Sequence, residues 1–146
     1  MSFAQLAKAA HELAHALGLL HVHSRYDRDK YVVINVKNIP ANLLKNDFAL
    51  ETKAATDNYD VPYDYGSRMH YPASAFALDK SMPTIIPVDK NYVETMGSPF
   101  VSFYDILLMN KHYGCLGESK IPDAFSHAFI KCACVSFKYA PTSYSD

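Results

Sequence analysis

The sequence predicts an α+β fold that is mostly irregular, with one helix near the amino end and a second helix toward the carboxyl end. Both predicted helices begin at a serine that has Gln or Asp three residues later, Ser2 and Ser102. Between them, residues 31–36 and 84–88 favour extended structure. The remaining segments carry few periodic signals. A chain of 146 residues with this pattern fits one ordinary domain.

The first helix is expected to begin at a capping box formed by Ser2 and Gln5 and to continue to Leu17. Gly18 follows at the position where a left-handed cap ends a helix. Apolar residues at helical spacing form one stripe, which comprises Phe3, Leu6, Ala10, Leu13 and Leu17. Two histidines lie nearly opposite that stripe. Such a helix should be covered on both faces, and no strand precedes it in the chain to cover the apolar face.

The middle of the chain contains short elements separated by loops. Residues 31–36 (YVVINV) are expected to form a strand or extended segment, and a weak helix is expected within residues 41–56, around residues 43–50. Residues 57–66 are rich in Asp, Asn, Tyr and Pro and therefore predict a loop. Residues 84–88 are expected to be extended but interrupted by prolines.

The second helix is expected to begin at a capping box of Ser102 and Asp105 and to end near residue 112. Its candidates for burial are Phe103, Ile106, Leu107 and Tyr113. Beyond Gly117 the pattern fades. We therefore expect a domain over residues 1–117 and a divergent, loose tail over residues 118–146.

Composition and charge exclude several classes of protein. Hydrophobic residues make up 49% of the chain and charged residues 20%, which suits a folded core. Lys and Arg number 14 against 15 Asp and Glu, so neither nucleic acid nor a membrane is expected as a partner. No apolar run approaches the roughly 20 residues of a membrane-spanning helix, and no signal peptide is visible.

The chain has three cysteines, Cys115, Cys132 and Cys134. Because the number is odd, at least one of them has no partner within the chain, and the last two are too close in sequence to pair easily. A reduced cytosolic protein fits this set. So does a piece of a secreted protein that has lost the other half of a disulfide.

The segment HELAHALGLLH matches the pattern H-E-x-x-H-x-x-G-x-x-H at every defined position. His11 and His15 are four residues apart, so both imidazoles lie on one helical face and can reach one ion. Gly18 can adopt a positive φ and turn the chain back, which lets His21 approach as a third ligand. The spacing therefore predicts one zinc ion per chain, bound by three histidines.

Three nitrogen ligands leave a fourth position for water, which is typical of a catalytic zinc site and not of a closed structural one. Glu12, beside the first ligand, is expected to act as the general base that takes a proton from this zinc-bound water. The same carboxyl group would later protonate the leaving amine. No cofactor other than zinc is expected.

Two stretches, HELAHALGLLHVHSRYDRDKYVVIN and YDYGSRMHYP, resemble the astacin family of metzincin zinc endopeptidases. TIIPVD and MGSPFVSFYDILLMNKHYGC resemble the end of the same domain in nematode members, so the match covers residues 8–117. The resemblance implies the carboxy-terminal part of a metzincin-like catalytic domain. It also implies cleavage of internal bonds in protein or peptide substrates, and an extracellular location.

The resemblance further implies roles for residues 67–71, which correspond to the Met-turn. Met69 would form an apolar floor under the zinc ligands, and Tyr71 would act as an additional ligand that can swing away to stabilise the oxyanion. A plain packing role for Tyr71 is the alternative. His23 is interpreted as a surface histidine and not as a further ligand. The charged residues at 25–29 fit a solvated turn and a salt-bridge cluster equally well.

Two features depart from the family pattern. Val22 stands where the family has a glutamate that meets the mature amino terminus through water, and valine cannot accept that hydrogen bond. In addition, the chain begins at the helix, so the strand-rich amino-terminal half of the catalytic domain is expected to be missing. Cys115 matches the family's last cysteine, whose disulfide partner lies in that half.

The leading functional hypothesis is a zinc metalloendopeptidase. The alternative is a truncated, non-catalytic remnant that keeps the zinc site for stability or for binding another protein. A purely structural zinc module is disfavoured, because the site offers three nitrogens beside a candidate general base.

Overall fold

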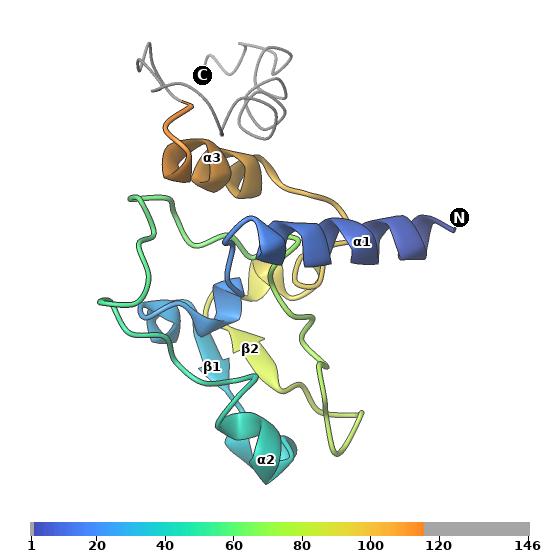
Figure 1. The fold of residues 1–146 in the computed structure, drawn as a ribbon. Coiled ribbons are helices and arrows are strands. Elements are labelled where there is room, and N and C mark those ends of the chain that lie inside the picture. The colour runs from blue at the N-terminus through green and yellow to red at the C-terminus, as the bar shows by residue number, and fades with distance from the viewer. Residues whose placement is uncertain (1, 116–146) are drawn as a thin grey trace.

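The structure is a computed structural model, which describes residues 2–115 (Figure 1). Its elements are α1 (Phe3–Ala16), β1 (Val32–Ile34), α2 (Ala41–Leu44), β2 (Ile85–Pro87) and α3 (Phe103–His112), with short 3-10 turns between some of them. The predicted α+β class is confirmed, as is the largely irregular course of the chain. The tail predicted for residues 118–146 lies outside the described residues. Within them, no helix combines the length and apolarity needed to cross a bilayer.

Helix α1 begins as its sequence predicts. The Ser2 backbone N–H donates to Gln5 Oε1 at 2.7 Å, and the Gln5 N–H donates to Ser2 Oγ at 3.3 Å. The two bonds satisfy N–H groups that the first helical turn leaves without partners. On the apolar stripe, Phe3, Leu6 and Leu13 are 56–58% exposed. Over these positions the stripe is therefore uncovered by the described residues.

Strands β1 and β2 form a two-stranded antiparallel sheet, in which Val33 lies opposite Ile86. Val32 and Ile85 are buried, whereas Val33 and Ile86 are exposed. This alternation is the period of two that a strand with one covered face requires. Both predicted extended segments are thereby confirmed, although each strand is three residues long.

A short helix forms within residues 41–56 as expected, but its predicted extent around residues 43–50 is wrong. Helix α2 spans Ala41–Leu44. The Phe48 N–H still bonds to the Leu43 carbonyl at 3.1 Å, but as part of a turn. This turn carries the Phe48 ring into the core, where it is 2% exposed. Tertiary burial of one aromatic ring therefore decided the local conformation.

The hydrophobic core is built largely from loops, together with one residue of each strand. The segment with the third histidine and the Met-turn segment both contribute to it. The cluster comprises Leu19, Val22, Val32, Ile39, Phe48, Tyr63, Tyr65, Met69, Ile85 and Met96. Burial of these side chains supplies the main stabilisation of segments that have little regular hydrogen bonding of their own.

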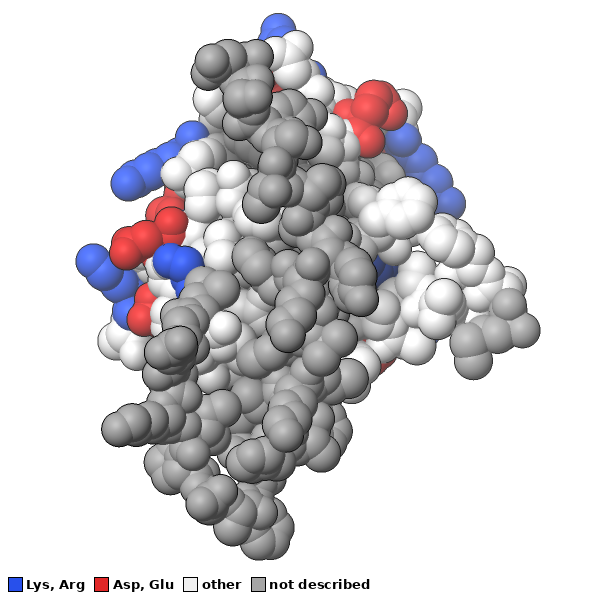
Figure 2. Space-filling view, turned by 90° about the horizontal axis from the view of Figure 1, so that it is seen from above, with Lys and Arg blue, Asp and Glu red and all other residues white. Residues whose placement is uncertain are grey.

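Charged side chains do not gather by sign on the face seen from above. In Figure 2, Lys and Arg atoms lie next to Asp and Glu atoms among the described residues of this view. This agrees with a formal net charge of −1. The view therefore offers no basic patch of the kind that attracts polyanions.

Helix α3 docks on the Met-turn segment through the carboxylate of Asp105. The expected burial of Phe103 is wrong. Phe103 is 54% exposed, whereas Asp105 and Asn110 are buried. Asp105 completes the predicted capping box with Ser102. It also accepts hydrogen bonds from the Ser67 hydroxyl and from the Arg68 N–H, the latter at 2.9 Å. One buried side chain thus joins the start of α3 to the Met-turn segment.

Replacing Asp105 is expected to destabilise the fold more than its place in a helix cap alone explains. Asp105→Ala leaves buried donors of Ser67 and Arg68 without their acceptor, which we expect to lower the free energy of unfolding by about 3 kcal/mol. Urea denaturation followed by circular dichroism measures this change. Glu94→Ala, at an exposed carboxylate, is the control and should change stability by less than about 0.5 kcal/mol. Equal effects of the two variants would contradict the link.

Candidate metal centre

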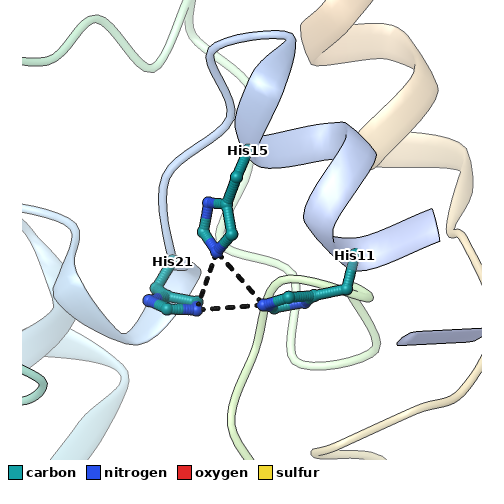
Figure 3. Close-up of side chains that lie close together, drawn as sticks. All are labelled: His11, His15 and His21. Carbon is teal, nitrogen blue, oxygen red and sulfur yellow. Dashed lines mark hydrogen bonds between the residues drawn. The ribbon is translucent and has the colours of Figure 1, made fainter. Parts of the chain in front are cut away.

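Three imidazole rings meet at one point beside α1 (Figure 3). His11 and His15 project from α1, and His21 comes from the loop that follows it. The Nε2 atom of His15 lies 3.1 Å from those of His11 and His21, and the third edge of the triangle is 3.2 Å. The spacing predicted from sequence therefore brings all three proposed ligand nitrogens together.

Backbone carbonyls fix two of these rings from behind. His11 Nδ1 lies 3.0 Å from the Arg68 carbonyl oxygen, and His15 Nδ1 lies 2.8 Å from that of Leu19. A carbonyl only accepts, so each Nδ1 carries a proton and donates, and Nε2 is the nitrogen of each ring that is left to bind a metal ion. The two Nε2 atoms lie 3.1 Å apart and face each other. A cation between them satisfies both.

The triangle fits zinc. A tetrahedral zinc ion with Zn–N bonds of about 2.0–2.1 Å requires ligand nitrogens about 3.3 Å apart, close to the separations found here. Neutral imidazole suits this ion, and a carbonyl behind a ligating ring is its usual support. Burial, and then the neighbouring His15 and His11, lower the pKa of His21 to about 4. His21 is therefore neutral at physiological pH, as a ligand must be.

The turn after α1 positions the third histidine. Gly18 has a φ of +91°, in the left-handed region that glycine adopts without steric cost. Its N–H bonds to the His15 carbonyl at 2.9 Å, and the Leu19 N–H bonds to the Ala14 carbonyl at 3.0 Å. Leu19 is then buried in the core. The predicted role of Gly18 in the turn is consistent with this geometry.

The Met-turn segment contacts the ligand-bearing segments at two points. The Arg68 carbonyl holds His11, and the Met69 carbonyl accepts from the N–H of Val22, next to the third histidine, at 3.0 Å. The Met69 side chain is 1% exposed. The Arg68 guanidinium also bonds to the Ala7 carbonyl in α1, at 2.9 Å. Residues 68 and 69 thus tie both parts of the centre together.

Tyr71 and Glu12 lie close to this centre. The Tyr71 ring is 4.7 Å from the His21 ring, centre to centre. Burial, followed by the Asp47 and Glu12 carboxylates, raises the pKa of the Tyr71 hydroxyl. Glu12 is exposed on α1 beside His11. The Tyr71 ring is therefore near the imidazoles, Glu12 adjoins His11 in the chain, and the chemical roles of both residues stay predictions.

The interpretation of His23 as a surface histidine is wrong. Its side chain is 0% exposed, its Nε2 bonds to the Asp47 carbonyl at 2.9 Å, and its ring stacks on Tyr71. Burial lowers the pKa of His23 to about 3, so the ring is neutral. The sequence did not reveal this, because the segments that enclose the ring lie 24 or more residues away.

The charged run at residues 25–29 combines both of the expected alternatives. Arg25 and Asp27 form a largely buried salt bridge at 2.8 Å. Arg28 is buried and donates to the carbonyls of His23 and Phe48 at 3.0 and 2.7 Å. Asp29, whose side chain is 71% exposed, is solvated. The buried members hold the loop that follows the third histidine.

Sequence reasoning missed three residues that support the centre: Arg68, Asp105 as an acceptor for the Met-turn segment, and Asp47. Arg68 and Asp105 act across 37 or more residues of sequence. The capping box predicted that Asp105 caps α3, but not that it accepts hydrogen bonds from the Met-turn segment. For Arg68 and Asp47 the sequence carries no local signal.

Fold and site together define the class of zinc-binding domains that place two histidines of H-E-x-x-H on a helix and a third beyond a glycine turn. The sequence model of the astacin peptidase family matches residues 2–114. The chain belongs to the astacin family.

Individual relatives agree with this membership. Zinc metalloproteinase nas-31 of Caenorhabditis elegans is 52% identical over 112 residues, which are 76% of this chain and 18% of that protein. Zinc metalloproteinase nas-29 of the same organism is 45% identical over 114 residues, 77% of this chain and 21% of that protein. The solved structure of high choriolytic enzyme 1, a hatching enzyme zinc-protease from Oryzias latipes (medaka), matches with a TM-score of 0.65 and 39% identity. The match covers 71% of this chain and 50% of that chain.

The predicted resemblance is therefore confirmed, and the histidine cluster fits the zinc that the relatives' names specify. The chain spans about a fifth of the length of these two curated relatives and half of the solved chain. Cys115 is disulfide-bonded.

Substitutions of Gly18 should show that the backbone of the turn positions His21. A Cβ here would meet His112 Nε2 at 3.5 Å, an ordinary contact, so the cost arises from the positive φ. We expect Gly18→Val to lower the free energy of unfolding by about 2 kcal/mol and Gly18→Asn by less than about 1 kcal/mol, because asparagine tolerates this region. Denaturation measures stability, and a zinc titration should rank affinity in the same order. Equal behaviour of the two variants would exclude a backbone cause.

Proposed function

We propose that this chain acts as a zinc metalloendopeptidase that hydrolyses internal peptide bonds of proteins or peptides. The observation that carries the proposal is the triangle of Nε2 atoms from His11, His15 and His21, with the exposed residue Glu12 directly after His11 in the chain. Three neutral nitrogens leave a coordination position for a reactant, which a closed structural site lacks. Membership in the astacin family supports the same reaction class.

His11, His15 and His21 would hold the zinc ion, with Gly18 setting the turn and Met69 packed in the core beneath it. Zinc bound here would supply a Lewis acid that lowers the pKa of water to about 7 and polarises a carbonyl group. The carbonyls of Arg68 and Leu19 keep two rings in the required tautomer.

Glu12 would accept the proton from the attacking water and later deliver it to the leaving amine. An exposed carboxylate adjacent to a ligand has access to both. Tyr71 would donate its hydroxyl hydrogen bond to the peptide carbonyl oxygen as negative charge develops there. Its raised pKa keeps the phenol protonated and therefore able to donate. Family membership also supports an extracellular site of action, which we include in the proposal.

A second candidate function is a non-catalytic zinc module that binds another protein. The exposed stripe on α1 favours it, because Phe3 contacts the ring of Phe100, itself 64% exposed, at 5.5 Å and widens the apolar surface. Contiguous apolar surface of this kind is typical of a contact with another polypeptide. This surface is compatible with a peptidase, so the activity of the chain decides between the candidates.

The zinc-loaded full chain, Glu12→Gln and His15→Ala together test the proposal. We expect the parent to bind one zinc ion and to cleave an unfolded protein substrate within its chain. Glu12→Gln should bind zinc equally well and cleave at least about 100-fold more slowly, because the general base is lost. His15→Ala should lose most of the zinc, as measured by metal analysis after dialysis.

Cleavage by Glu12→Gln at the parent's rate would refute the proposed mechanism. A parent that holds one zinc through the three histidines and cleaves no protein substrate would favour the non-catalytic module instead.

A further inference from the structure

His23 is a completely buried side chain two residues beyond the third zinc ligand, and the zinc chemistry above gives it no role. Its Nε2–H donates to the Asp47 carbonyl at 2.9 Å. Its Nδ1 has no hydrogen-bond partner among the described residues. A buried ring with one unsatisfied nitrogen costs stability, and a function in positioning a neighbour accounts for that cost.

The neighbour is Tyr71. The rings of His23 and Tyr71 stack 4.0 Å apart, centre to centre, with 24° between their planes. The ring of His21 is tilted relative to that of Tyr71 and lies 4.7 Å from it, centre to centre. Phe76 and Phe48 follow at 5.5 and 6.0 Å. These rings limit the tilt of the Tyr71 ring. The hydroxyl of Tyr71 can still choose between hydrogen-bond acceptors.

Asp47 offers such a partner. The Tyr71 hydroxyl donates to Asp47 Oδ1 at 3.5 Å, a long and therefore weak hydrogen bond. The backbone that carries this carboxylate is held at two successive carbonyls. His23 holds the Asp47 carbonyl, and Arg28 holds the Phe48 carbonyl at 2.7 Å. His23 therefore contacts the Tyr71 ring and, at the same time, places the carboxylate that meets its hydroxyl.

We propose that Asp47, placed by His23, is a positioning residue that competes with the zinc centre and the substrate for the Tyr71 hydroxyl. A phenol has one O–H and donates to one acceptor at a time. While it donates to Asp47 it is withheld from a peptide carbonyl, and the length of the bond allows its release. This inference rests on the proposed function, because it assumes that Tyr71 acts at the metal.

Copper provides a test that does not depend on peptidase activity. Cu²⁺ accepts imidazole ligands in the same site, and a phenolate bound to it gives a visible charge-transfer band. The intensity of the band per bound copper, measured on the full chain at fixed pH, reports the fraction of Tyr71 at the metal. Tyr71→Phe should remove the band while copper remains bound.

Asp47→Ala should increase the band per bound copper by about threefold, since a weak competing hydrogen bond shifts a two-state population by roughly that factor. Asp47→Asn, which keeps the shape, should give a smaller increase. His23→Phe keeps the stacking but loses the bond to the Asp47 carbonyl, and should also increase the band. Glu94→Ala, at an exposed carboxylate, should leave it unchanged.

The outcomes separate this inference from the proposed function. A band of unchanged intensity in Asp47→Ala and Asp47→Asn, with parental thermal midpoints, overturns the competition. Copper bound through the histidines without a phenolate band in any variant overturns it as well, while the metal centre stands. A chain that binds no copper overturns both. If His23→Phe fails to fold, Asp47→Asn decides.

Discussion

Three imidazole nitrogens converge on one point in this protein, and two of the rings are fixed there by backbone carbonyls behind them. The carbonyl of Leu19 belongs to the glycine turn after α1, and the carbonyl of Arg68 belongs to the Met-turn segment. Because each carbonyl accepts a hydrogen bond from Nδ1, Nε2 is the nitrogen of each of these rings that is left to bind a metal ion. The orientation of two of the ligand rings therefore depends on the folding of the glycine turn and of the Met-turn segment.

Few regular elements support this arrangement, so individual polar side chains carry much of it. Asp105 joins α3 to the Met-turn segment, and Arg68 joins that segment to α1. Arg28 holds the loop beyond the third ligand against Phe48. Each of these groups is charged and meets backbone donors or acceptors in a buried or partly buried place, where such bonds are stronger than at the surface.

Features that depend on residues close together in the sequence could be predicted from the sequence. The capping boxes at Ser2 and Ser102 and the left-handed Gly18 were readable because they depend on residues within four positions. The three ligands were readable for the same reason, since helix pitch and one turn fix their spacing. The burial of individual side chains could not be predicted in this way. Phe103 is exposed and Asp105 is buried because α3 docks on a polar segment 37 residues away. His23 is buried because residues near 47 and 71 enclose it. Contacts between such distant segments produce no periodic pattern of residues in a single sequence.

The open three-nitrogen zinc centre is the feature from which every functional statement about this chain follows. Zinc X-ray absorption spectroscopy on the full chain loaded with one equivalent of the metal tests it most directly. The geometry predicts three imidazole nitrogens at about 2.0–2.1 Å and at least one further light-atom ligand. A sulfur ligand at about 2.3 Å, or fewer than three imidazoles, would contradict it.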